Sequence, residues 1–408
     1  MTAVPQGKES LLEAYRAFCA PGAVEELERL ATSLAGRSVL HLYSHGFGDD
    51  RTRMVHRLGS IMASLGIYPR WDVLVGTEEF FEAVRTLREG LLGRVGVVSP
   101  RIMQAYQDCL RGNAGRIYLE ADYVLVHDFQ PFGLVEWRGK DSKWIWRCHH
   151  DLSHAAPALR RFCLNYIRRY DAAVFSHPKF THKVPVPLSV IAPSIDPLHE
   201  RNHQLSPVQI ERILTRLGIP QDRPIVLVVL RESAARQSAS LLDALQALGK
   251  RLPLRLVVAR AGISEIEGGL PLEEIRRRVG DRAGVHLLNL SSESHRELNA
   301  LGRAAHVCVH TLHEGGLEVS VLEDLWRGKP VIAGPRIGRV IPVVHGKTGF
   351  VARSVTESVL CTERVLKDSE LARRVGEGAH ELIRERYLIT RHVRDYLMLF
   401  RRLTETGR

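Results

Sequence analysis

The sequence predicts an α/β protein built from two doubly wound domains, and three observations support this fold class. Short apolar runs of strand length alternate with helical patterns along the chain, which is typical of parallel sheets joined by crossover helices. The alternation stops once, between residues 191 and 205, where two prolines and the polar stretch HERNHQ indicate a linker, and then restarts. The chain of 408 residues also exceeds the length that one hydrophobic core normally supports.

Apolar runs on both sides of this linker are expected to be strands. Those before it are residues 39–43, 70–75, 123–127, 144–147, 172–175 and 188–192. Those after it are residues 225–230, 254–259, 285–290, 305–309 and 330–333. A helix is expected over residues 319–326, and a long amphipathic helix over residues 384–404. The predicted domains are therefore residues 1–198 and 199–383, followed by a helical segment, 384–408.

The composition is that of an ordinary globular protein, with 45% hydrophobic and 25% charged residues. No apolar run approaches the roughly 20 residues of a membrane span, and the N-terminal MTAVPQGKES lacks the apolar core of a signal peptide. The six cysteines are scattered without a CxxC pair, which favours reduced thiols. We expect a cytoplasmic protein.

Two binding hypotheses are considered and set aside. The net charge of +11 suggests a nucleic-acid partner, but the basic residues are interleaved with acidic ones along helical stretches and no nucleic-acid-binding motif accompanies them. The excess of arginine also suits a protein that binds an anionic diphosphate. The run Cys148-His149-His150 resembles part of a zinc site but lacks a second ligand pair at zinc spacing. We therefore expect no metal.

The most informative stretch runs from residue 310 to residue 350. An expected strand, 305–309, is followed by the turn Glu314-Gly315-Gly316 and then by the helix 319–326. Ligands of open α/β sheets bind at the carboxyl ends of the strands. Glycines let backbone N–H groups approach a ligand, and a helix N-terminus favours a phosphate or a sugar hydroxyl. The stretch predicts a nucleotide-sugar pocket in which Glu323 accepts hydrogen bonds from two ribose hydroxyls.

This stretch resembles the EGFG…E signature of the retaining GT-B glycosyltransferases, in the large family that includes sucrose and trehalose synthases. Five further stretches resemble the trehalose glycosyltransferring synthases in the same order along the chain: residues 47–48, 71–81, 126–131, 144–153 and 193–198. The resemblance covers most of the chain. It implies a GT-B fold, with two Rossmann-like domains facing a cleft. Residues 1–198 would bind the acceptor, residues 199–383 the donor, and the final helix would pack back on the first domain.

The resemblance also implies roles for individual residues of the donor site. An Arg and a Lys hold the diphosphate in the family, at the positions of Arg231, after the strand 225–230, and of Arg236, ahead of a helix expected to begin near Ser238. Glu314 would contact the transferred sugar. The family places seven residues between its two carboxylates and this chain places eight between Glu314 and Glu323, so a bulge at the two glycines is required. The implied donor-binding set is Gly48, Arg231, Arg236, Gly315, Gly316, Leu317 and Glu323.

Three further positions follow strands of the first domain. The counterpart of His149 in the family contacts the donor sugar near the reacting carbon, which completes an implied catalytic set of His149, Arg231, Arg236 and Glu314. His127 and Asp128 are expected to bind an acceptor sugar, and Asp128 can equally fix a turn before Pro131.

The loop after the first strand departs from the family, because Gly48-Asp49-Asp50 stands where the family has consecutive glycines. Asp49 and Asp50 are expected to bind hydroxyls, or an amine, on a different acceptor.

The leading hypothesis is a retaining transfer of a hexose, with glucose expected, to a sugar-like hydroxyl acceptor. The donor would be UDP-, ADP-, GDP- or dTDP-glucose, with no cofactor and no metal. An aminosugar or cyclitol acceptor is one alternative. A catalytically degraded protein that only binds nucleotide sugars is another, motivated by the altered loop and the shifted glutamate spacing. A homodimer is left open.

Overall fold

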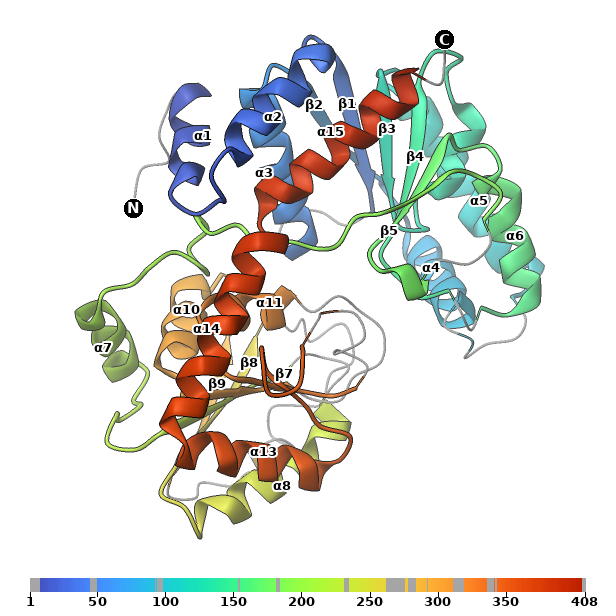
Figure 1. Ribbon diagram of the computed structural model, residues 1–408. Helices are drawn as coiled ribbons and strands as arrows, with labels where there is room; N and C mark the ends of the chain where they lie inside the picture. Colours follow the sequence, from blue (N-terminus) through green and yellow to red (C-terminus); the bar gives the residue numbers. More distant parts are fainter. Residues whose placement is uncertain are drawn as a thin grey trace. The chain divides into compact units, whose positions relative to one another are not determined.

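The computed structural model describes residues 8–44, 50–91, 93, 98–152, 155–180, 184–230, 235–261, 276–277, 284–291, 293–310, 319–335, 341 and 343–405. The chain forms two compact units (Figure 1), one of residues 1–193 with residues 389–408 and one of residues 194–388. The sequence predicts divisions after residues 198 and 383, and the units divide after Pro193 and Leu388.

The first unit contains a six-stranded parallel sheet with the strand order β2-β1-β3-β4-β5-β6. The strands are β1 (Ser38–Tyr43), β2 (Tyr68–Val73), β3 (Tyr123–His127), β4 (Lys143–Cys148), β5 (Ala172–Phe175) and β6 (Leu188–Val190). The helices are α1 (Lys8–Arg16), α2 (Ala23–Ala31), η1 (Thr32–Leu34), α3 (Asp50–Ser64), α4 (Glu78–Leu91), α5 (Pro100–Arg116), η2 (Phe132–Trp137), α6 (Pro157–Ile167), η3 (Pro178–Phe180) and α15 (Ile389–Glu405). The strand order reverses between β1 and β3, which makes their carboxyl ends the switch point of this sheet.

The two faces of the first sheet contact different helices, because side chains alternate along each strand. Figure 1 shows α15 running across the strands, and this helix also packs against α2 and α3. On that face the ring of Tyr123 stacks on Phe400 of α15, with ring centroids 4.3 Å apart. On the opposite face Trp146 of β4 lies against Phe132 of η2. The final helix is therefore part of the core of the first unit.

The helix predicted over residues 384–404 is interrupted at Tyr387 and Leu388, between α14 and α15. Leu388 forms a parallel bridge with Ile195, and the Tyr387 carbonyl accepts a 2.8 Å hydrogen bond from the Ile195 N–H. Tyr387 has left the helical conformation, with φ −130° and ψ 14°, so the prediction of one continuous helix is wrong. The partner is distant in the sequence, and a local helical pattern carries no trace of it.

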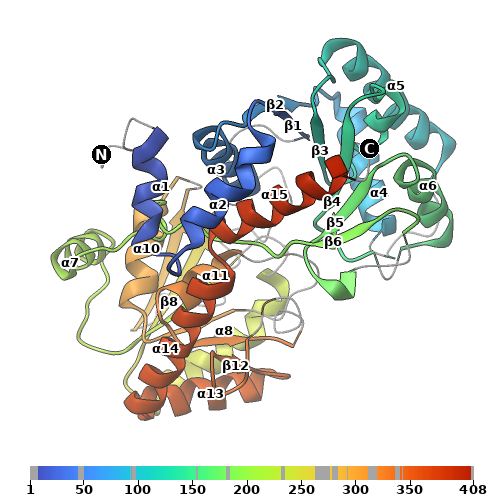
Figure 2. The ribbon, with the colours of Figure 1, turned by 45° about the horizontal axis from the view of Figure 1, so that its top comes forward.

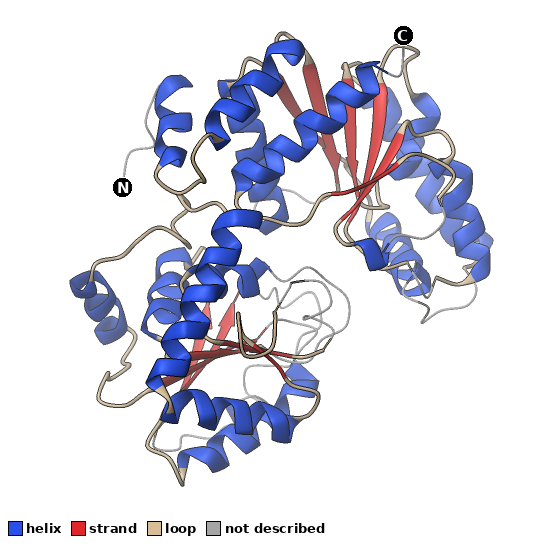
Figure 3. Cartoon of the chain, viewed as in Figure 1, coloured by secondary structure: helices blue, strands red, loops and turns tan. Residues whose placement is uncertain are grey.

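The second unit contains another six-stranded parallel sheet, with the order β12-β11-β10-β7-β8-β9. The strands are β7 (Ile225–Leu230), β8 (Arg255–Ala261), β9 (Val285–Leu290), β10 (Val307–Val309), β11 (Val331–Ala333) and β12 (Phe350–Val351). The helices are α7 (Pro207–Arg216), α8 (Ala235–Gly249), α10 (His295–Ala304), α11 (Val319–Trp326), α13 (Val355–Lys367) and α14 (Ser369–Arg386). Figure 3 shows the helices and strands of both units in separate colours. The switch point lies between β7 and β10.

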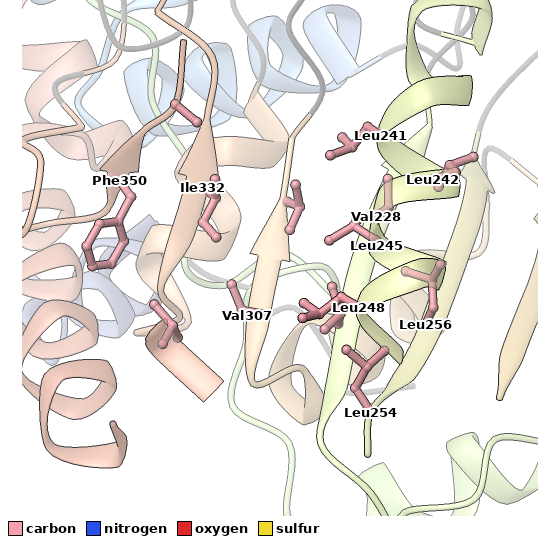
Figure 4. Packing of buried hydrophobic residues seen from close by; sticks show 14 of the residues in the cluster. Val228, Leu241, Leu242, Leu245, Leu248, Leu254, Leu256, Val307, Ile332 and Phe350 are labelled. Carbon is pink, nitrogen blue, oxygen red and sulfur yellow. The ribbon is translucent and has the colours of Figure 1, made fainter. Parts of the chain in front are cut away.

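Sequence signals explain how several of these elements begin and pack. Helix α7 begins with a capping box, in which Ser206 accepts a hydrogen bond from the Gln209 N–H and the Gln209 side chain accepts one from the Ser206 N–H. The leucines of α8 lie over apolar residues of β7 and β8 in one buried cluster (Figure 4). A buried leucine contributes about 1.5–3 kcal/mol to folding. The cluster thus fixes α8 on this face of the second sheet.

The predicted strands are found within two residues of their expected bounds, and four match fully: β3, β5, β7 and β9. The two-residue strand β12 is an addition that no pattern predicts. Helix α8 begins at Ala235 rather than near Ser238, so Arg236 lies in the first helical turn and not in the preceding loop. Within the described ranges, no helix has both the length and the apolar character needed to cross a membrane.

Candidate functional site

The structure describes some of the predicted site residues fully and leaves others outside the described residues. Those outside are Gly48, Asp49, Arg231, Glu314, Gly315, Gly316 and Leu317. Asp50 is the first residue of α3 and Arg236 lies in the first turn of α8, but the described structure does not include their side chains. The predicted residues that are fully described are His127, Asp128, His149 and Glu323.

The predicted segments begin at the carboxyl ends of strands in the two sheets. His127 ends β3, and the loop with Gly48 and Asp49 follows β1, its neighbour across the first switch point. Figure 2 shows the same strands after a turn of the view. In the second unit, Arg231 follows β7 and Glu314 follows β10, and these strands pair with Val228 beside Val309. The topology thus brings the starts of these segments to the positions where open α/β sheets bind ligands.

Asp128 is the most constrained residue of the first switch point. Its φ angle is 63°, in the left-handed region, which a residue other than glycine adopts only at a cost. Its side chain accepts a 2.9 Å hydrogen bond from the His149 N–H, and its carbonyl accepts one of 2.8 Å from Trp146 Nε1. The Asp128 side chain therefore joins the end of β3 to the residue that follows β4. This backbone conformation agrees with the expectation that Asp128 fixes a turn. Its role in binding an acceptor stays a prediction.

Imidazole side chains from β1, β3, α15 and the residue after β4 lie near one another. We call His41, His127, His149 and His392 the histidine cluster. His41 Nδ1 and His127 Nε2 share a 3.1 Å hydrogen bond, and the rings stack with centroids 5.4 Å apart. The ring of His127 also stacks on that of His149, with centroids 6.2 Å apart. The contacts among His41, His127 and His149 therefore run from the interior of β1 to the residue after β4.

The buried members of the histidine cluster are neutral. Burial, and then the proximity of His127 and His56, lowers the pKa of His41 well below its ordinary value. Burial also lowers the pKa of His392 well below the ordinary value, and the charge of Arg391 adds to this effect. Both side chains are almost fully buried. Each therefore acts as a neutral imidazole, with one donor and one acceptor nitrogen.

The side chains of Cys148, His149 and His150 contact different groups. The thiol of Cys148 is fully buried and lies 3.5 Å from the His150 carbonyl. Burial, and then the charge of Asp128, raises the pKa of this thiol well above its ordinary value. A metal binds the thiolate rather than the neutral thiol. Among the described residues, no group of three or more His, Cys, Asp or Glu side chains is arranged to hold a metal ion.

Glu323 lies on α11 and is buried, with only 5% of its surface exposed. Its Oε2 is 3.7 Å from Arg201 Nη1 and 3.9 Å from Arg327 Nη2. These separations are ion-pair contacts and exceed hydrogen-bond length. The carboxylate is therefore held between two cations, and its predicted role in binding a ribose stays a prediction.

Sequence reasoning missed three partners in these sites. His41 and His392 join the histidine cluster from β1 and α15, and only the strand order and the packing of the last helix bring them to His127. In the second unit Asp324, next to Glu323, pairs with His310. The sequence carries one signal for His41, which is its polarity. A histidine is uncommon within the apolar run of a buried strand such as SVLHLY.

Comparison with known proteins places the chain in a family. Residues 42–182 match the family described as trehalose synthase, N-terminal domain, and residues 209–382 match glycosyl transferases group 1. The chain is 33% identical to a trehalose synthase of Pyrococcus horikoshii over 393 residues, which cover 95% of each chain. It is 28% identical to a trehalose synthase of Rubrobacter xylanophilus over 411 residues, which cover 98% of each.

Solved structures share the fold at much lower identity. Sucrose-phosphate synthase from Thermosynechococcus elongatus aligns with a TM-score of 0.69 at 14% identity, covering 91% of this chain and 100% of that one. The HepE protein of Anabaena in complex with UDP aligns with a TM-score of 0.61 at 15% identity, covering 91% and 99%. These neighbours and the two parallel sheets show a GT-B fold. Because trehalose synthases are similar to this chain along nearly its whole length, the chain belongs to the trehalose synthase family of glycosyltransferases.

Proposed function

We propose that the protein is a retaining glycosyltransferase that moves glucose from a nucleoside diphosphate glucose to a hydroxyl group of a sugar-like acceptor. The observation that carries this proposal is the match to trehalose synthases over 95% of the chain. When the acceptor is glucose, the product is trehalose. The position of the site segments at both switch points supports the proposal, because it gives each unit a ligand-binding edge.

In this proposal the first unit binds the acceptor. His127, Asp128 and His149 offer ring nitrogens and a carboxylate at one sheet edge, and such groups match the hydroxyls of a sugar. His149 hydrogen-bonds the donor sugar near the reacting carbon. Asp49 and Asp50 contribute to acceptor choice from the neighbouring loop.

The second unit then binds the donor. Arg231 and Arg236 hold the diphosphate, Glu314 and the Gly315-Gly316-Leu317 turn contact the transferred sugar, and Glu323 contacts the ribose. The HepE neighbour was solved with UDP and with UDP-glucose, which supports testing a uridine donor first. Retention needs no carboxylate nucleophile here if the leaving phosphate helps to remove the acceptor proton on the same face. We propose that the reaction needs no metal.

A turnover assay tests the proposal. The purified protein is incubated with UDP-, ADP-, GDP- and dTDP-glucose against glucose, glucose phosphates, aminosugars and cyclitols, and products are identified by mass spectrometry. The anomeric configuration of the product, read by proton NMR, distinguishes retention from inversion. Product from glucose supports a trehalose-type synthase. Product only from an aminosugar or a cyclitol supports the alternative acceptor, which the Asp49-Asp50 departure favours. Binding of a nucleotide sugar without any product would support a protein that has lost catalysis.

The ribose role of Glu323 has its own test. Wild-type protein should bind UDP more tightly than 2′-deoxy-UDP, because a charged hydrogen bond to a hydroxyl contributes about 1.5–3 kcal/mol. Glu323→Gln should reduce this preference, whereas Glu381→Gln, an exposed change on α14, should preserve it. Equal preference in wild type and Glu323→Gln would remove Glu323 from the ribose site.

The structure leaves all six cysteines free, which supports a reducing compartment, and we propose the cytoplasm. A homodimer stays a prediction that mass measurement in solution can test.

A further inference from the structure

Arg260 is a buried arginine near the carboxyl end of β8, and the sequence prediction gave it no role. It pairs in register with Leu230, the last residue of β7, and with Asn289 of β9. Only 6% of its surface is exposed. Its Nε has no hydrogen-bond partner, and no acidic side chain among the described residues pairs with its guanidinium. Within the described ranges, this largely buried guanidinium therefore has no carboxylate beside it.

Arg255, near the amino end of the same strand, provides a direct comparison. It is similarly buried, with 7% of its surface exposed. Its guanidinium forms an ion pair with Asp222 and lies 2.7 Å from His286 Nε2. Strand β8 therefore carries two buried arginines. Arg255 has a counter-charge in Asp222, whereas Arg260 has none among the residues that the structure describes.

An unpaired buried charge is unfavourable, because desolvation of an ion costs several kcal/mol unless an opposite charge compensates it. A bound ligand of opposite charge would offset this cost for a buried arginine. The position of Arg260 fits this explanation, because β8 lies beside β7 at the edge that binds ligands in open α/β sheets. Arg255, at the other end of the strand, already has a carboxylate in Asp222.

The nature of the missing ligand follows from the surroundings of Arg260. Leu256 and Val258 belong to the cluster that packs against α8 (Figure 4). Arg260 is two residues further along β8, so it emerges on the same face as these two residues. Helix α8 follows β7, so its N-terminus belongs to the same carboxyl edge and carries partial positive charge. A guanidinium and a helix N-terminus together favour a phosphate group.

We propose that Arg260 binds phosphate oxygens of the nucleotide donor and that the donor diphosphate is its missing counter-charge. This proposal rests on the proposed nucleotide-sugar transfer and adds a third arginine to Arg231 and Arg236. It predicts opposite effects on ligand binding and on stability. Removing the charge weakens the binding of diphosphates and stabilises the ligand-free protein.

Calorimetric titration and thermal unfolding of the full chain test the proposal with Arg260→Met and the matched control Arg255→Met. UDP, ADP, GDP and dTDP are titrated beside uridine, adenosine, guanosine and thymidine. Arg260→Met should weaken binding of the preferred diphosphate at least about tenfold and leave its nucleoside unchanged. Its Tm without ligand should rise. Arg255→Met should lower the Tm and leave diphosphate affinity unchanged. Arg260→Lys, which keeps the charge, should bind more tightly than Arg260→Met.

The outcomes separate this inference from the proposed function. Wild-type protein that binds none of the four diphosphates would overturn both. Wild-type binding that Arg260→Met leaves unchanged, or that it weakens equally for nucleoside and diphosphate, would overturn the role of Arg260 alone. A fall in the Tm of Arg260→Met would also count against it. Inorganic pyrophosphate is titrated as a further probe. If Arg260→Met lost pyrophosphate binding but kept nucleotide binding, Arg260 would bind a free anion, and this outcome would contradict a contact with the donor.

Discussion

Asp324 on α11 accepts a 2.9 Å hydrogen bond from Nε2 of His310, and this contact joins the two sides of the segment 311–318, which carries the predicted sugar-binding turn. Both side chains are almost completely buried. Burial alone would raise the pKa of the Asp324 carboxyl, but the hydrogen bond from His310 and the charge of Arg327 outweigh it and lower that pKa. The pair therefore fixes where β10 ends relative to the helix that follows it.

Asp324→Asn should destabilise the protein by about 3–5 kcal/mol, because it removes the counter-charge of a buried arginine. Urea unfolding followed by circular dichroism measures the loss. The carboxylate has a lowered folded-state pKa, so its contribution is complete above the ordinary pKa of 3.8 and disappears as the pH falls through the folded-state value. The difference between variant and wild type should therefore shrink in acid. Glu381→Gln, in an exposed pair with Arg384, should change little. Equal unfolding of wild type and Asp324→Asn near neutral pH would contradict the role of the pair.

The buried histidines predict how stability depends on mild acid. His41 and His392 have folded-state pKa values well below 6.5, so below that pH the unfolded chain binds protons that the folded chain does not. Stability should fall as the pH drops below 6.5, by up to about 1.4 kcal/mol per pH unit for each histidine. His41→Asn, which keeps a donor near the position of Nδ1, should reduce the slope of unfolding free energy against pH. The double variant with His392→Asn should reduce it further. An unchanged slope would show that these side chains are not buried neutral.

Asp128 combines a strained backbone with a carboxylate in the proposed acceptor site, and two substitutions separate these features. Asp128→Asn tolerates a positive φ angle and can still accept the hydrogen bond from His149 N–H, so its stability should lie within about 1 kcal/mol of wild type. Asp128→Ala loses both advantages and should unfold more easily. If the carboxylate binds the acceptor, Asp128→Asn raises the acceptor KM while the donor KM is preserved. Loss of stability in both variants with unchanged KM values would assign the residue to the turn alone.

Much of the fold was predictable because the signals are local. Buried parallel strands are apolar runs bounded by polar residues, so β3, β7 and β9 were found at their full bounds. The interruption between α14 and α15 was not predictable, because the bridge that causes it joins Leu388 to Ile195. The short strand β12 has too few residues for any periodicity.

Some residues of the candidate site were also predictable from the sequence, and others were not. His127 and His149 follow apolar runs at strand ends, where ligands gather, and a sequence shows this directly. His41 lies in the interior of β1 and contacts His127 only through the strand order of the sheet. Arg260 did leave a signal, as a charge near the end of the apolar run LVVARA, but its lack of a partner is visible only in three dimensions.

The last helix should be essential to the first unit, and two neighbouring residues test this with one control. Phe400 is fully buried, stacks on Tyr123 and accepts a 3.3 Å hydrogen bond from the Tyr123 hydroxyl at its carbonyl. Met398, on the same helix, is 52% exposed. Phe400→Ala should cost about 3–5 kcal/mol, because it removes a large buried ring and leaves a cavity. Met398→Ala should cost little.

Differential scanning calorimetry measures both variants, with limited proteolysis as the local readout. Because two-unit proteins need not unfold in one step, Phe400→Ala should shift the transition of the first unit most and expose residues 1–193 to protease before residues 194–388. Equal destabilisation by Met398→Ala would show that the Tyr123–Phe400 contact is not what holds α15, because alanine does not lower helix propensity. A Phe400→Ala variant with wild-type unfolding would mean that the helix can leave the sheet without loss.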